Sequence, residues 1–168
     1  MKSIRNIAFA ALMTIGAFSA ITYTACNKDE CKDVVCNNGG TCVDGTCSCP
    51  TGYEGTNCDT KSRDKFIGSW AGSDKCGLGT YTITLSIAAS SSSNVTALVS
   101  NPGGFGTAVT ITGNVTASNT LAFNQQSIGG GRTLTGTMTF NGNNMTFKYT
   151  VTEAVGTSDS CDGTYSRQ

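Results

Sequence analysis

The distribution of cysteine constrains this chain more than any other feature. The sequence has 168 residues and nine cysteines, and seven of these lie between Cys26 and Cys58. The other two, Cys76 and Cys161, stand apart. A short cysteine-dense stretch behind an export signal is typical of a disulfide framework formed in an oxidising compartment. A zinc cluster is the alternative, but the chain has no histidine, so it would need four thiolates.

The N-terminal residues have the organisation of an export signal. Lys2 and Arg5 give a charged start, and an uncharged apolar run follows from residue 7 to residue 21. This run is short for a membrane span and contains many small residues. We therefore expect a signal peptide over residues 1–25, with a true anchor helix as the alternative.

The end of the apolar run carries a lipidation pattern. The residues Thr24, Ala25 and Cys26 resemble a bacterial lipoprotein signal, although Tyr23 replaces the usual leucine. The resemblance implies that Cys26 becomes the lipidated (palmitate-bearing) N-terminus of the mature chain and attaches it to a membrane.

The residues directly behind Cys26 form an acidic tether, which we place at residues 26–30. Lys28, Asp29 and Glu30 resemble the surface-export signal of Bacteroidetes-type lipoproteins. A solvated charged linker is the alternative. The resemblance implies a cell-envelope protein, held in the outer membrane and exposed at the cell surface.

Six cysteines within residues 31–58 follow a distinctive spacing. A Gly-Gly-Thr precedes the third cysteine and a Gly-Tyr-Glu-Gly precedes the sixth, and the whole pattern is Cys31-x4-Cys36-x5-Cys42-x4-Cys47-x-Cys49-x8-Cys58. A segment this short cannot bury enough apolar surface to fold without covalent staples. From the sequence alone, six cysteines permit fifteen pairings.

This spacing resembles the EGF-like family. The resemblance implies three disulfides, Cys31–Cys42, Cys36–Cys47 and Cys49–Cys58, and we expect Tyr53 to cover the last of them. Asn27, Asp29 and Glu30 also resemble the start of the calcium-binding EGF pattern, and their oxygen atoms suit a hard cation. The second half of that pattern is missing between the third and fourth cysteines. We therefore expect no metal and no cofactor, and keep these three residues as the calcium candidates.

After a polar linker at residues 59–65, residues 66–168 alternate apolar and polar with period two. Such alternation predicts half-buried strands, and threonine fills many of the polar positions. The Asn141-Gly142 pair between two alternating runs indicates a β-hairpin. Eight strands are expected, near residues 66–71, 79–89, 93–100, 105–116, 119–127, 131–140, 144–154 and 160–167.

Short turns between these strands predict that consecutive strands are antiparallel neighbours. Closure into a barrel is the simplest way to remove the exposed sheet edges. The Gly68-Ser69-Trp70 segment resembles the opening motif of lipocalins, in which an arginine near the end, here Arg167, packs over the tryptophan. A core tryptophan with a surface arginine is the alternative. The predicted fold class is all-β: a disulfide-rich EGF-like module followed by an antiparallel, eight-stranded, lipocalin-like barrel.

The remaining cysteines fit this closure. Cys76 lies just after the first predicted strand and Cys161 lies within the last, and these strands are adjacent in a closed barrel. We therefore predict a Cys76–Cys161 disulfide, whose long loop gives it a contribution of roughly 4–5 kcal/mol. Cys26 is then left for the lipid.

Composition narrows the function. Eleven basic residues balance eleven acidic ones, which argues against nucleic-acid binding. Without histidine, most acid–base and nucleophilic arrangements are lost. Asp159 and Asp162 fit turn and surface positions, and the glycine run before Arg132 lacks the lysine of a phosphate loop. We expect a protein that is not an enzyme.

Two binding functions and one further class remain. The first is a surface-anchored interaction module whose partner is an unknown protein, glycan or small apolar ligand. The second is a carrier of a small apolar ligand in the barrel mouth, which a cavity of several hundred Å³ would favour. The third is a hydrolase-like or protease-inhibitor-like activity whose residues the sequence does not show.

Overall fold

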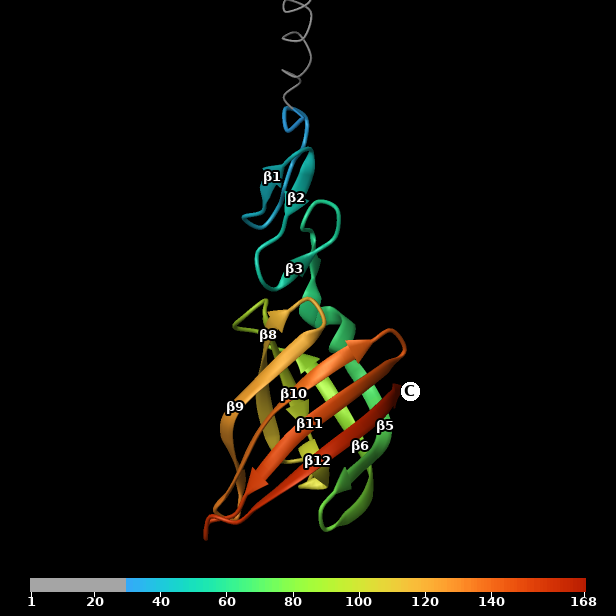
Figure 1. Cartoon of the computed structure of the whole chain (residues 1–168), viewed down its shortest axis with the longest axis vertical. Coiled ribbons are helices and arrows are strands. Elements are labelled where there is room, and N and C mark those ends of the chain that lie inside the picture. The colour runs from blue at the N-terminus through green and yellow to red at the C-terminus, as the bar shows by residue number, and fades with distance from the viewer. Residues whose placement is uncertain (1–29) are drawn as a thin grey trace, which may run out of the picture. The chain divides into compact units, whose positions relative to one another are not determined.

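The computed structural model describes residues 30–168. The predictions for the signal peptide, Cys26, Asn27 and Asp29 fall outside the described residues. The strands and 3₁₀ helices of these residues all belong to the compact unit Val34–Gln168. A disulfide-rich segment comes first along the chain and an eight-stranded barrel follows it (Figure 1).

The disulfide-rich segment contains two small hairpins. The strands β1 (Thr41–Val43) and β2 (Thr46–Ser48) pair antiparallel, and β3 (Tyr53–Glu54) pairs with β4 (Thr60–Lys61). Disulfides join Cys36 to Cys47 and Cys49 to Cys58. Cys31 and Cys42 are disulfide-bonded as well. Strands this short bury almost no apolar surface, so the disulfides supply the constraint that a core supplies elsewhere.

The stretch expected to be a polar linker has regular structure. Its first part contains β4, and its second part begins the 3₁₀ helix η1 (Ser62–Phe66). Arg63 is buried, and its Nη1 donates hydrogen bonds to the backbone carbonyls of Ser90, Ser93 and Thr96. One guanidinium thus holds the whole loop between two barrel strands.

The prediction of an all-β fold with a closed eight-stranded barrel is confirmed. In the described residues the helical segments are η1 and the short 3₁₀ turn η2 (Pro102–Gly104). Every neighbouring pair of barrel strands is antiparallel, and β12 pairs with β5 to close the sheet. The strands are β5 (Gly68–Cys76), β6 (Gly79–Ala89), β7 (Thr96–Ser100), β8 (Thr110–Ala117), β9 (Thr120–Gly129), β10 (Arg132–Asn141), β11 (Asn144–Thr152) and β12 (Ser158–Arg167).

Three strands differ most from those expected. The first strand begins at Gly68 because Phe66 belongs to η1, and it continues to Cys76 instead of ending at residue 71. Strand β7 begins only at Thr96, after the loop that Arg63 holds. Residues 105–109 lie in a loop rather than in a strand, so β8 begins at Thr110.

The predicted hairpin between β10 and β11 is present, but its turn is shifted by one residue. Asn141 pairs with Asn144, so the two-residue loop is Gly142-Asn143. Gly142 has a φ of 69°, and a positive φ at the first loop position is the requirement of a type II′ turn, which glycine meets without a side-chain clash.

Alternating side chains fill the barrel. Most inward positions are apolar and buried, whereas most threonines between them face outward. The largest completely buried apolar side chains are Trp70, Tyr165, Phe66, Phe147, Leu85, Ile111, Leu121, Leu134, Met138, Met145 and Val99. Tyr81 lies on the same face of β6 as the buried Ile83 and Leu85 but is 47% exposed, because it lies near the start of the strand, where the barrel opens.

Candidate functional site

The connections between strands fall into two sets, one at each end of the barrel. Because consecutive strands run antiparallel, the loops after β5, β7, β9 and β11 lie at the same end. We call this end the mouth, and we call the opposite end, which contains Trp70, the closed end. The mouth loops are residues 77–78, 101–109, 130–131 and 153–157.

The closed end is covered by aromatic packing. Trp70 is completely buried, and its Nε1 donates a hydrogen bond to the Phe66 carbonyl at 2.7 Å. Phe140 packs edge-on against both rings. The Arg167 guanidinium lies 4.5 Å from the centre of the Trp70 ring and donates to the carbonyls of Ile67 and Lys65. These contacts close the barrel over the tryptophan.

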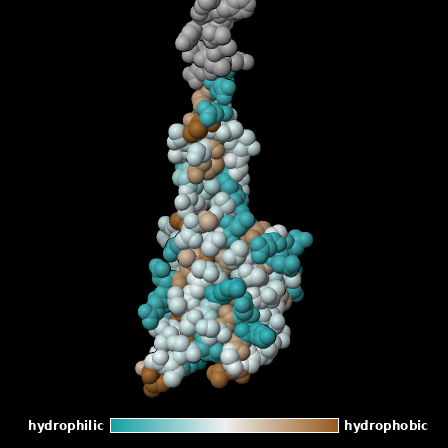
Figure 2. All heavy atoms as spheres, viewed as in Figure 1, coloured by the Kyte–Doolittle hydropathy of each residue, from teal (hydrophilic) through white to brown (hydrophobic). Residues whose placement is uncertain are grey.

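The mouth, in contrast, contains a pocket of about 330 Å³. Its walls combine apolar, aromatic and charged side chains with backbone from η2. The lining residues are Cys76, Leu78, Tyr81, Gly103, Gly104, Phe105, Arg132, Tyr149, Val151, Glu153, Asp159 and Cys161. Figure 2 shows hydrophobic side chains exposed at the lower tips of the barrel, and among the described residues Leu78 is 83% and Val155 is 85% exposed.

A buried carboxylate lies behind the floor of this pocket. Asp74 is completely buried in β5, where Tyr149 donates a hydrogen bond to its Oδ2 at 2.6 Å and Tyr165 donates to its Oδ1. Burial raises the pKa of Asp74, although the two hydroxyl donors oppose that shift. Burial also raises the pKa of Tyr149 and Tyr165 far above the ordinary tyrosine value, and the hydrogen bond and charge of Asp74 add to it.

Glycine makes room for this cluster. Gly163 is the cross-strand partner of Asp74. A Cβ atom on Gly163 would lie 2.2 Å from Asp74 Oδ1 and 2.7 Å from the Tyr165 ring. The sequence therefore places a residue without a side chain opposite the carboxylate that two tyrosines hold.

Cys76 and Cys161 form a disulfide at the rim of the pocket. Asp159 lies beside it, and its carboxylate accepts hydrogen bonds from the backbone N–H groups of Gly77 at 2.8 Å and Leu78 at 3.4 Å. The two sulfurs and a carboxylate oxygen lie within 4.8 Å of one another. Because the sulfurs are bonded to each other, they are not available as thiolate ligands, and this cluster does not fit a metal ion.

Two loops cover one side of the mouth. The Arg132 guanidinium lies 4.8 Å from the centre of the Phe105 ring. Asn101, which has a left-handed backbone, fixes the loop that carries Phe105: its Nδ2 donates to the Thr84 carbonyl and its Oδ1 accepts from the Gly106 N–H, both at 2.9 Å. The pocket wall is thus held by side-chain contacts to the backbone.

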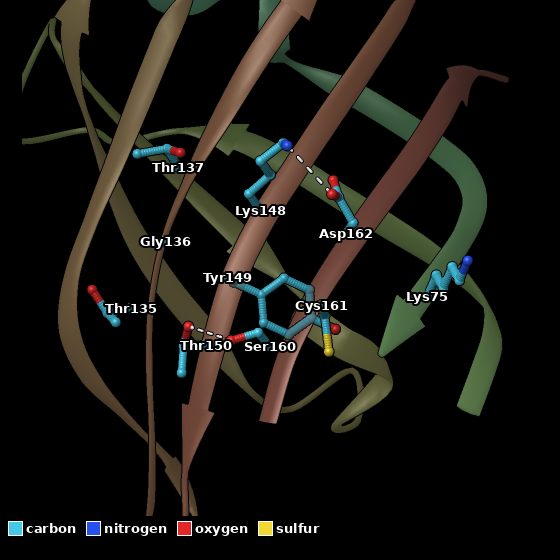
Figure 3. A pocket seen from close by; sticks show the side chains of 10 residues that line it. All are labelled: Lys75, Thr135, Gly136, Thr137, Lys148, Tyr149, Thr150, Ser160, Cys161 and Asp162. Atoms are coloured by element: carbon cyan, nitrogen blue, oxygen red, sulfur yellow. Dashed lines mark hydrogen bonds and ion pairs between the residues drawn. The ribbon is translucent and has the colours of Figure 1, made fainter. Parts of the chain in front are cut away.

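A second depression, of about 490 Å³, lies on the outer face of β10, β11, β12 and β5 (Figure 3). Most of its side chains carry hydroxyls or charges, and they include the Lys148–Asp162 ion pair at 3.3 Å and the Thr150–Ser160 contact at 3.2 Å. Both members of the ion pair are mostly exposed, so it contributes little stability. Ligand sites are typically concave with apolar walls, which favours the mouth pocket although this depression is larger.

The other residues singled out in the sequence lie away from the mouth, with two exceptions. Tyr53 is half-buried in β3, and its hydroxyl accepts a hydrogen bond from Asn94 Nδ2 at 3.3 Å. Glu30 is exposed in a turn. Asp162 faces outward, whereas Asp159 lines the mouth. Arg132 also lines the mouth, directly after the glycine turn.

The cluster of Asp74, Tyr149 and Tyr165 was not among the sites predicted from the sequence. The sequence did contain an indication of it. Asp74 and the inward-facing Trp70 are an even number of residues apart in β5, so their side chains point to the same face of the strand. A charged residue at an inward position requires a hydrogen-bonding partner. Because the strand was expected to end at residue 71, Asp74 was not counted among its inward positions.

The observed architecture defines an all-β protein with a disulfide-rich EGF-like module and a closed antiparallel barrel. A stretch of 57 residues is 54% identical to Fibropellin-1 of Strongylocentrotus purpuratus, which supports the EGF-like assignment. The match covers 32% of this chain and only 5% of that protein. No protein-family model matches the chain.

None of the helical segments in residues 30–168 has the length and apolar character needed to cross a membrane.

Proposed function

We propose that this protein is a non-catalytic binding module attached to the cell envelope, with the barrel mouth as its binding site. The observation that carries the proposal is the contrast inside the barrel: side chains fill the interior, and a pocket of about 330 Å³ remains at the mouth. Asp74 and Tyr165 are hydrogen-bonded to each other, but both are completely buried, so a substrate has no access to them.

The pocket favours a small ligand as the occupant, which is the carrier function considered from the sequence. Its volume lies near the lower limit for small-molecule sites, and it combines apolar walls with a few polar groups. The EGF-like module then acts as a spacer or a second contact surface.

Ligand retention tests the binding proposal. The full chain, isolated from its own cell envelope, should carry a small molecule detectable by native mass spectrometry. Leu78→Lys places a positive charge at the pocket wall and should abolish retention, whereas Val43→Lys is a matched control on the exposed β1 strand. Equal retention by both variants would place the binding site away from the mouth.

The anchor is proposed from the sequence pattern that ends at Cys26. Several acyl chains hold a protein stably in a membrane, since each buried methylene contributes about 0.8 kcal/mol. Labelling with a radioactive fatty acid should mark the wild type but not Cys26→Ser. A mature N-terminus other than residue 26, together with no label, would disprove lipidation.

A further inference from the structure

The charges around the mouth pocket are unbalanced. Glu153 and Asp159 line it, and Arg132 is the basic residue among the lining residues. Asp74 lies behind Tyr149, which donates a hydrogen bond to it. Two acidic side chains thus face one basic side chain among the lining residues, which favours a cationic ligand.

Asp159 is fixed in position at this site. Its two hydrogen bonds from the turn after β5 hold the carboxylate at the rim of the pocket. The charge of Asp159 is among the causes that raise the pKa of Tyr149, after burial and the hydrogen bond and charge of Asp74. Asp159 and Asp74 thus both lie near Tyr149, which lines the pocket.

Aromatic rings form a large part of the remaining wall. Tyr81, Phe105 and Tyr149 all line the pocket, and aromatic faces attract cations. Arg132 already lies over Phe105, which shows that a cation is accommodated against a ring at this site. Leu78 and Val151 provide purely apolar surface beside the rings.

We propose that the mouth pocket binds a small organic ammonium ion that carries an apolar body. This inference rests on the proposed function, because it names the ligand class of the same site. The ammonium group lies toward Glu153 and Asp159, and the apolar body contacts the aromatic and aliphatic walls. An anionic ligand of the same shape is repelled by the same carboxylates.

Three probes of similar shape and different charge test the ligand class. Isothermal titration calorimetry with the full chain at pH 7 would compare 2-phenylethylamine, 2-phenylethanol and 3-phenylpropionate. We expect the amine to bind about tenfold more tightly than the alcohol, and the carboxylate to bind more weakly than both. Amide shifts of Gly77, Gly103 and Gly104 in NMR spectra would locate the probes at the mouth.

Matched variants assign the preference to the carboxylates. The double variant Glu153→Gln with Asp159→Asn should bring the amine to the affinity of the alcohol. The amide oxygen introduced at position 159 still accepts the turn hydrogen bond, so the loop keeps its support. Asp162→Asn removes a nearby acid that faces outward beside Lys148, and it should leave the amine preference unchanged.

The outcomes separate the ligand class from the binding function. Equal affinity for amine and alcohol at the mouth would overturn the ammonium class and leave the mouth as a binding site. Tighter binding of the carboxylate would overturn the class as well. If no probe binds at millimolar concentration, the ammonium inference fails, while retention of a native ligand still tests the proposed function separately.

Discussion

The two ends of the barrel are built from the same eight strands, but different kinds of side chain cover them. At the closed end, Trp70 and its aromatic neighbours are buried, and Arg167 covers them from outside. At the mouth, the buried side chain at the matching inward position of β5 is a carboxylate, and Leu78 and Tyr81 are exposed around a pocket. The closed end thus has the composition of a core, and the mouth has the composition of a binding site.

This difference separates stability from binding. Apolar burial at the closed end stabilises the fold, whereas burial of Asp74 at the mouth is favourable only because two tyrosine hydroxyls satisfy it. Substitutions at the closed end should therefore lower stability without changing ligand affinity.

The Cys76–Cys161 disulfide is an exception to this separation of stability from binding. It lies at the mouth, yet its removal should have the largest effect on stability. It joins strands that pair directly and closes a loop spanning 85 residues in sequence. Replacing both cysteines with serine should lower the free energy of unfolding by roughly 4–5 kcal/mol. Urea unfolding followed by the fluorescence of the single tryptophan, Trp70, measures this loss. A loss below about 1 kcal/mol would show that strand pairing alone closes the barrel.

Trp70→Ala should have the next largest effect. The indole is completely buried, so its removal leaves a cavity beside Phe66 and Phe140, and we expect a loss of about 3–5 kcal/mol. Unfolding followed by circular dichroism measures the change, and Trp70→Phe should cost less. Amine affinity at the mouth should stay unchanged. If affinity falls along with stability, the two ends are coupled through the barrel core.

Asp74→Asn should change how the stability of the mouth depends on pH. The pKa of Asp74 is raised in the folded state above its ordinary value of 3.8, so the folded protein binds the proton more tightly than the unfolded chain does. The stability from this group is fully present below pH 3.8 and is lost as the pH rises through the folded pKa. The difference in unfolding free energy between wild type and variant should therefore shrink with rising pH.

Urea unfolding of both proteins from about pH 3 to about pH 8 measures this difference, because the other carboxyl groups are common to both. A stability advantage of the wild type that grows with pH would contradict the expected sign. It would mean that the Tyr149 and Tyr165 hydroxyls stabilise the ionised carboxylate by more than its burial costs.

Most of the barrel was predictable because its signal is local. Alternation with period two depends only on one face of each strand being buried, and it located all eight strands. The strand ends were less predictable, since they depend on contacts between distant residues. Residues 105–109 lie in a loop because Asn101 fixes that segment to the backbone of β6, and the sequence carries no local mark of this contact.

The mouth could be predicted only in part for the same reason. Leu78, Phe105, Arg132 and Asp159 come from four separate segments, and the closed barrel alone brings them together. Asp74 was recognisable by parity, but its partners Tyr149 and Tyr165 are 75 and 91 residues away. At the closed end, by contrast, a short motif and one arginine near the C-terminus marked the residues that meet.

Arg167 gives the smallest expected effect and the finest test of the closed end. Its guanidinium lies over Trp70 and donates to the carbonyls of Lys65 and Ile67, so it joins the end of β12 to the segment before β5. Because the side chain is exposed, we expect Arg167→Gln to lower the free energy of unfolding by only about 1 kcal/mol. Arg167→Lys keeps the charge but loses the planar fork, and it should recover only part of that loss. Urea unfolding at two salt concentrations separates the contribution of charge from that of the planar fork. Salt weakens the charge interaction, whereas the contribution of the fork depends on its geometry. If lysine restores full stability, charge alone explains the contact and the stacked geometry contributes nothing.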